Sequence, residues 1–259
     1  DVPVDCLFFD QLGARPWLRD FNRASPHADA YYDGWLAVMA PYSDRCLMVE
    51  DGWDRLARDF TGFHGGMLMM TRELDLPDEL FGEGNWEPYP LASWLFHDKV
   101  LLYQHDLYDG TMAADGEVLT WNMAFGLISS YGWADLTNSL RSQWLGLVGD
   151  LQRILGPHYA GVSMTGYRNV TPEVTETTFG DLVVLANWDS TAGYATERFG
   201  IARGGFVART RDDRLLAGAF EDTLDGVALS EGTHYVIAER DEVSVTVRQP
   251  FGADTNLAI

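Results

Sequence analysis

Short apolar runs of strand length alternate with longer amphipathic stretches in the first part of the chain, and this alternation limits the fold more than any other feature. Residues 4–9 (VDCLFF), 46–49 (CLMV) and 100–104 (VLLYQ) are nearly continuous apolar runs. Between the first two, residues 27–40 carry apolar side chains at helical spacing. Continuous apolar strands separated by amphipathic helices predict βα units and a parallel sheet, because both faces of such a sheet are covered.

The pattern changes near residue 160. Before this point, residues 117–126 and 137–155 predict helices on either side of a short strand, and residues 66–70 fit a strand or a helix equally well. After it, short alternating segments separated by Gly and Asp turns predict an antiparallel β-sandwich. These segments span residues 181–186, 205–210, 215–220, 234–238 and 243–248. We therefore predict a parallel α/β domain at 1–160 and an all-β antiparallel sandwich domain at 161–259.

The net charge is strongly negative, with 39 acidic and 18 basic residues and a formal charge of −21. Such a surface repels nucleic acid phosphates and anionic membranes. No run approaches the roughly 20 apolar residues of a membrane-spanning helix. We expect neither nucleic acid nor a membrane as a partner. Because the sequence contains no His or Cys cluster with metal-ligand spacing and no glycine-rich phosphate loop, we also expect no metal and no cofactor.

The two cysteines, Cys6 and Cys46, lie in separate apolar runs. Cysteine is among the residue types most often buried in proteins. We therefore predict reduced, buried thiols and no disulfide framework.

Three strand-like runs end in acidic residues, Asp10, Glu50 and Asp106. At the carboxyl ends of parallel barrel strands, side chains face a common cavity. Glycoside hydrolysis needs two carboxyl groups, and neighbouring strands can place them roughly 5 Å apart, which is the retaining geometry. The alternative interpretation is structural, because acids after a strand often cap the next helix or bond a loop. Asp51 competes with Glu50 for the inward position.

Aromatic and polar residues near the same strand ends are candidate substrate contacts. Sugar rings stack their C–H faces on aromatic side chains, so tryptophans in loops suit a saccharide cleft. A nearby arginine or histidine can hold a substrate hydroxyl or orient a carboxylate. The candidates of these kinds are Trp17, Trp53, Trp86, Arg15 and His105.

The order of these segments resembles the later half of an α-amylase-type or endo-α-N-acetylgalactosaminidase-type glycosidase barrel, and also resembles uncharacterised bacterial barrel proteins. In these enzymes an Asp after the fourth strand is the nucleophile and a Glu after the fifth is the acid/base. Asp10 in FFDQLGAR and Glu50 in LMVEDGWDRL match those positions, and His105 and Asp106 in YQHD are similar to the His-Asp pair after the seventh strand. The resemblance implies an α/β fold with the later units of a TIM (β/α)8 barrel at 1–160. It also implies that the missing N-terminal part of the same barrel is a partner.

We therefore predict a retaining glycosidase with a carbohydrate substrate, in which Asp10 is the nucleophile, Glu50 the acid/base and Asp106 a contact to the transition state or a substrate hydroxyl. The alternative is a non-catalytic carbohydrate-binding or scaffold protein that keeps the aromatic cleft. A third interpretation is another class of enzyme on the same fold, because fold does not fix function.

Overall fold

The computed structural model describes residues 4–14, 20–25, 27–65, 89–104, 116–130 and 139–253. The chain divides into two compact units, Asp1–Tyr89 with Lys99–His105 and Pro90–Asp98 with Asp106–Ile259. The domain division predicted near residue 160 stays a prediction. In chain order the elements are β1 (Cys6–Gly13), α1 (Ala30–Met39), η1 (Ala40–Tyr42), β2 (Cys46–Asp51), η2 (Asp54–Leu56), β3 (Gly62–His64), α3 (Leu91–Phe96), β4 (Leu101–Tyr103), α5 (Gly116–Phe125), α6 (Ser139–Tyr159), β5 (Met164–Thr171), β6 (Val174–Phe179), β7 (Leu182–Asn187), β8 (Tyr194–Ala195), β9 (Phe199–Ile201), β10 (Phe206–Thr210), β11 (Leu215–Leu224), β12 (Val227–Ala228), β13 (His234–Arg240) and β14 (Val245–Gly252).

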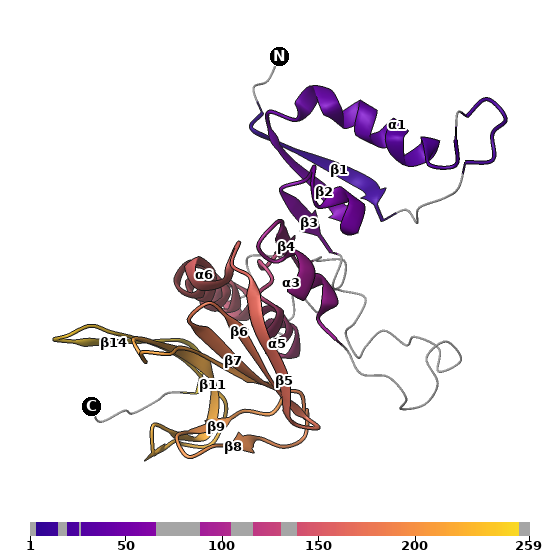
Figure 1. Ribbon diagram of the computed structural model, residues 1–259. Helices are drawn as coiled ribbons and strands as arrows, with labels where there is room; N and C mark the ends of the chain where they lie inside the picture. The colour runs from indigo at the N-terminus through magenta and orange to yellow at the C-terminus, as the bar shows by residue number, and fades with distance from the viewer. Residues whose placement is uncertain are drawn as a thin grey trace. The chain divides into compact units, whose positions relative to one another are not determined.

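The first unit contains a four-stranded parallel sheet in the order β1-β2-β3-β4, with α1 running beside β1 and β2 (Figure 1). One face of this sheet carries the buried side chains Leu47, Val49, Phe63 and Leu102. The residues on the other face are half-buried or exposed, except Gly62, which is buried. The apolar runs predicted as strands therefore form three of the four strands, and the helix predicted over residues 27–40 is confirmed.

The predicted TIM (β/α)8 barrel is wrong. Within the described residues, the parallel strands form an open sheet of four with β1 and β4 at its edges. Consecutive βα units place each strand beside the preceding one in an open sheet as well as in a barrel. The sequence pattern could therefore predict parallel order, but it could not decide whether the sheet closes.

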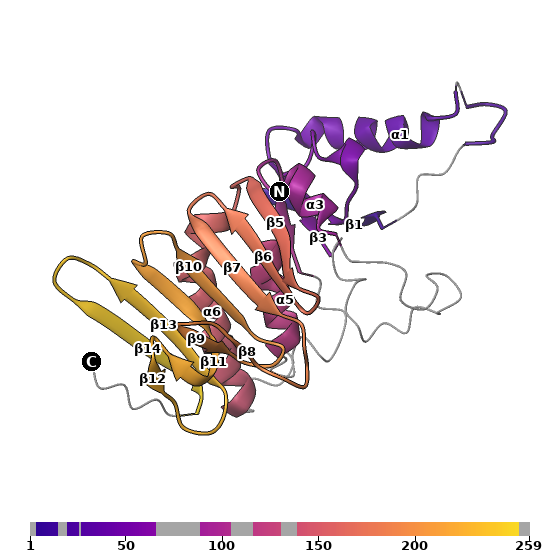
Figure 2. The same cartoon turned by 60° about the horizontal axis from the view of Figure 1, so that its bottom comes forward.

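The second unit is built on a ten-stranded antiparallel sheet, whose main path runs β14-β13-β11-β10-β7-β6-β5 (Figure 2). Tight turns fix its register. Between β11 and β12, for example, Asp225 and Gly226 both have positive φ, as a two-residue hairpin turn requires. Among the helices of the described residues, none is both long enough and apolar enough to cross a bilayer.

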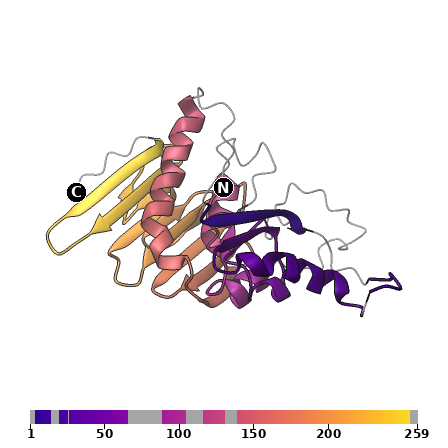
Figure 3. The ribbon, with the colours of Figure 1, turned by 90° about the horizontal axis from the view of Figure 1, so that it is seen from above.

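The predicted β-sandwich is also wrong, because within the described residues the strands of this unit form one sheet rather than two packed sheets. Helices α5 and α6 cover one face (Figure 3), where Trp144 packs edge-on against Tyr235 and Phe251 at centroid distances of 5.6 and 5.2 Å. On the opposite face, Phe199 and Ile201 of β9 join an apolar cluster with residues of β10, β11 and β13. Alternating strands require a covered face, but their pattern does not specify whether helices or a second sheet cover it.

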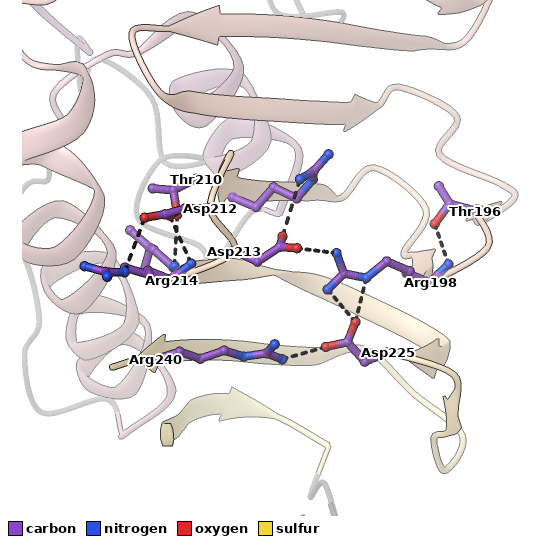
Figure 4. Close-up of polar contacts among 10 residues, drawn as sticks. Thr196, Arg198, Thr210, Asp212, Asp213, Arg214, Asp225 and Arg240 are labelled. Atoms are coloured by element: carbon purple, nitrogen blue, oxygen red, sulfur yellow. Dashed lines mark hydrogen bonds and ion pairs between the residues drawn. The ribbon is translucent and has the colours of Figure 1, made fainter. Parts of the chain in front are cut away.

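An arginine network ties the turns of the antiparallel sheet together (Figure 4). Arg198 donates to Asp225 at 2.8 Å and to Asp213 at 2.9 Å, and Arg240 also donates to Asp225 at 2.8 Å. Because Arg198 joins two turns, we expect Arg198→Ala to lower the free energy of unfolding by about 1 kcal/mol. Urea denaturation measures this loss, which should shrink in about 1 M NaCl. Arg153→Ala, which removes a single exposed pair to Asp150, is the control, and an Arg198 effect no larger than this one would contradict the role of the network.

His97 is a buried histidine that follows α3 and is 3% exposed. Its Nδ1 lies 2.7 Å from the carbonyl oxygen of Val162, and its Nε2 lies 2.8 Å from that of Gly126. Burial disfavours the imidazolium and lowers the pKa of His97. The effect of burial on the pKa is larger than the opposite effects of the two carbonyl acceptors and the nearby Asp98, which raise the pKa.

The lowered pKa of His97 predicts a loss of stability in mild acid. The unfolded chain takes up a proton at this histidine below about pH 6.5, before the folded chain does. The stabilisation that neutral His97 contributes to the folded chain is therefore complete above about pH 6.5. It is lost as the pH falls toward the pKa of His97 in the folded chain. We expect the unfolding free energies of the wild type and His97→Gln, measured at about pH 7.5 and about pH 5.5, to converge at the lower pH. A constant difference would contradict this prediction.

Candidate functional site

The two acids predicted as the catalytic pair lie on neighbouring strands of the parallel sheet. Phe8 pairs in register with Met48, and Phe9 pairs with Val49. Asp10 and Glu50 each follow the Phe9–Val49 pair by one residue, at the point where the register of the two strands shifts. Asp10 is exposed and Glu50 is half-buried. Adjacent strands lie about 4.8 Å apart, so acids on them can approach to the separation of roughly 5 Å between the carboxyl groups of retaining glycosidases.

A bulge in β1 opposes Glu50. After the Phe9–Val49 pair, the next register pair is Gly13 with Asp51, so residues 10–12 of β1 lie opposite the single residue Glu50. Gln11 has a φ of 63°, and its backbone N–H donates to Oε2 of Glu50 at 2.8 Å. Bulges beside functional sites re-aim side chains, and this one holds the Glu50 carboxylate in a defined orientation.

At the same strand ends, the close packing of the chain leaves no room for a side chain at two glycines. A Cβ at Gly13 would collide with the carbonyl oxygen of Glu50, and a Cβ at Gly52, where φ is 146°, would collide with the Phe63 ring. Asp51, between Glu50 and Gly52, has a φ of 54°. Positive φ at Gln11 and Asp51 therefore occurs directly after each of the two candidate acids. Non-glycine residues in this region cost free energy and cluster at functional sites.

The sequence analysis did not identify two side chains, His64 and Tyr103, that follow Glu50 in register on the next two strands. Glu50 pairs in register with His64 of β3, and His64 pairs with Tyr103 of β4. The His64 and Tyr103 rings are 6.4 Å apart between centroids, and burial raises the pKa of Tyr103. β3 is only three residues long, and the apolar run predicted as the third strand, residues 66–70, lies outside the described residues. The one available signal was a histidine closing the short segment TGFH.

The other predicted site residues divide into one described residue and five outside the described ranges. Trp53 is half-buried, and its ring lies 5.3 Å from that of Tyr32 on α1. Tyr32 in turn donates to the backbone oxygen of Arg55 at 2.8 Å. Trp53, which follows β2, therefore packs against the first helix. The residues outside the described ranges are Asp106, Arg15, Trp17, Trp86 and His105.

The two cysteines form a disulfide, so the prediction of reduced thiols is wrong. Cys6 and Cys46 pair in register at the start of β1 and β2, with Cα atoms 4.3 Å apart. Separate apolar runs became neighbouring strands, which brought the two thiols together on one face. The bond joins the same two strands that carry Asp10 and Glu50. Within the described ranges, no group of three or more His, Cys, Asp or Glu side chains is arranged to hold a metal ion.

Comparison of the sequence with protein-family models and with curated proteins finds no match.

Proposed function

We propose that this protein is a retaining glycosidase in which Asp10 and Glu50 are the reacting carboxyl groups. The observation that carries the proposal is that the two acids lie on adjacent parallel strands, at a bulge whose backbone N–H orients Glu50. Neighbouring strands can bring two carboxyl groups to the short separation that the retaining mechanism needs, whereas the inverting mechanism leaves room for a water between more distant carboxyl groups.

The division of roles follows the resemblance noted in the sequence, in which the Asp is the nucleophile and the Glu the acid/base. In the proposed mechanism the carboxylate of Asp10 forms an ester bond with the anomeric carbon. Glu50 gives its proton to the leaving oxygen as the glycosidic bond breaks. In the second step Glu50 takes a proton from the water that attacks the anomeric carbon, and the ester to Asp10 breaks.

Covalent trapping tests the proposal. Glycosyl fluorides that carry fluorine in place of the 2-hydroxyl form the ester with a retaining nucleophile but hydrolyse slowly, so the labelled protein accumulates. A panel with gluco, galacto, manno and xylo configurations in both anomers would be incubated with the protein, and the labelled peptide sequenced by mass spectrometry. We expect one fluorosugar attached to Asp10. Labelling of another residue, or of none by any member of the panel, would contradict the proposal.

A further inference from the structure

Three ring side chains lie beside the Asp10–Glu50 pair, two of them in a row with Glu50. Glu50, His64 and Tyr103 are register partners across β2, β3 and β4, and register partners in a parallel sheet point to one face. Two strand spacings separate Glu50 from Tyr103, a length of about 10 Å. Phe8 lies in the neighbouring register row with Met48 and Gly62, and its ring meets that of His64 edge-on at 5.6 Å.

Gly62 shapes the surface between these rings. A Cβ at Gly62 would lie 3.2 Å from Cε2 of Tyr103 and 3.3 Å from Cγ of Met48. The tyrosine ring therefore leans over the glycine and along the sheet. The His64 and Tyr103 rings are inclined to each other by only 39°. On the other side of His64, Phe8 is 50% exposed, so its ring surface is open to solvent.

The side chains of this row have the chemistry that sugar rings require. Aromatic rings accept the C–H faces of a sugar, while imidazole, phenol and carboxylate groups bond its hydroxyls. The phenol of a tyrosine keeps its proton at neutral pH, and burial raises the pKa of Tyr103 further, so this phenol can donate to a hydroxyl oxygen. An anionic ligand would meet the carboxylates of Asp10 and Glu50, and a wholly apolar ligand would desolvate them without compensation.

We propose that Phe8, His64 and Tyr103 form a subsite for a second sugar ring, next to the ring whose anomeric carbon faces Asp10. The inference rests on the proposed glycosidase function. The subsite selects substrates of at least two sugar units, because Tyr103 lies two strand spacings from Glu50, beyond the reach of a single ring held at the carboxyl pair.

Steady-state kinetics with aryl monoglycosides and aryl diglycosides of the same configuration test the subsite. Tyr103→Leu removes the flat ring, and Tyr103→Phe removes only the hydroxyl. Because Tyr103 lies two strands from Glu50, we expect each variant to raise KM for the diglycoside about tenfold, with kcat and the monoglycoside KM within about twofold of the wild type. Phe21→Leu is the matched control, because Phe21 is 84% exposed and lies outside the row. Equal effects on both substrates, or none, would overturn the subsite.

A binding measurement separates failure of the subsite from failure of the catalytic proposal. Methyl mono- and diglycosides are titrated into Asp10→Asn, and the ring resonances of His64, identified among the six histidines with a His64→Gln variant, are followed by NMR. We expect the diglycosides to shift these resonances even if fluorosugars fail to label Asp10. If no glycoside of the panel shifts them, the subsite is refuted, whatever the outcome at Asp10.

Discussion

Asp10→Asn and Glu50→Gln, made separately, are each expected to lower kcat for an aryl glycoside by a factor on the order of 10³. Each change keeps the size of the side chain and removes either the attacking carboxylate or the carboxyl group that donates the proton and then activates the water. Gln11 N–H can still donate to the side-chain oxygen of glutamine at position 50, so the local backbone has no reason to rearrange. Steady-state rates and circular dichroism spectra of the two variants would be compared with those of the wild type.

The two variants should differ in their response to azide. In Glu50→Gln, an aryl group that leaves without protonation still allows the ester to Asp10 to form, and azide then replaces the water that Glu50 no longer activates. We expect azide to restore turnover in this variant as the glycosyl azide, and to leave Asp10→Asn inactive. Asp51→Asn is the matched control, because it neutralises the adjacent acid with a residue that tolerates positive φ. Near-normal rates in either test variant would remove the case for hydrolysis.

Local patterns predicted most of the strands and helices because burial imposes a period on the sequence. Residues 46–49 and 215–220 read as strands, and 137–155 as a helix, since each segment buries enough apolar side chains to show its own repeat. β3 has three residues, which are too few to show a repeat of apolar side chains. Its strand character depends on neighbours β2 and β4, which pair with it on either side.

Local sequence patterns could not predict the features that depend on contacts between distant parts of the chain. Sheet closure and the choice between helices and a second sheet as a covering layer are properties of the assembled fold. The disulfide depends on the register of two strands whose cysteines are 40 residues apart.

The candidate site was predictable to the extent that strand ends define it. Polar residues at the ends of two apolar runs singled out Asp10 and Glu50. The bulge at residues 10–12 required a comparison of two strands, because it is visible only as a difference in residue count between register pairs. His64 was missed for a related reason, since its place in the row comes from pairing with Glu50.

Removal of the disulfide should have the largest effect on stability. Closing a loop of 40 residues restricts the unfolded chain, and the loop-entropy relation gives a stabilisation of about 4 kcal/mol for Cys6–Cys46. We expect the double variant Cys6→Ser/Cys46→Ser to lose about this free energy in the unit that contains the parallel sheet. Because the chain has two compact units, hydrogen exchange at amides within that sheet is a better measurement than a global unfolding curve.

The Thr61 amide, which donates to the Leu47 carbonyl, reports on this unit, and a loss of about 4 kcal/mol raises its exchange rate roughly 10³-fold if it exchanges by unfolding of the unit. Wild-type protein treated with a dithiol reductant should match the double variant, since both lack only the covalent bond. Amides of β10 and β11 serve as the internal control and should exchange at unchanged rates. Unchanged exchange at Thr61 would mean that sheet packing alone fixes the register of β1 and β2, and that Asp10 and Glu50 stay adjacent without the bond.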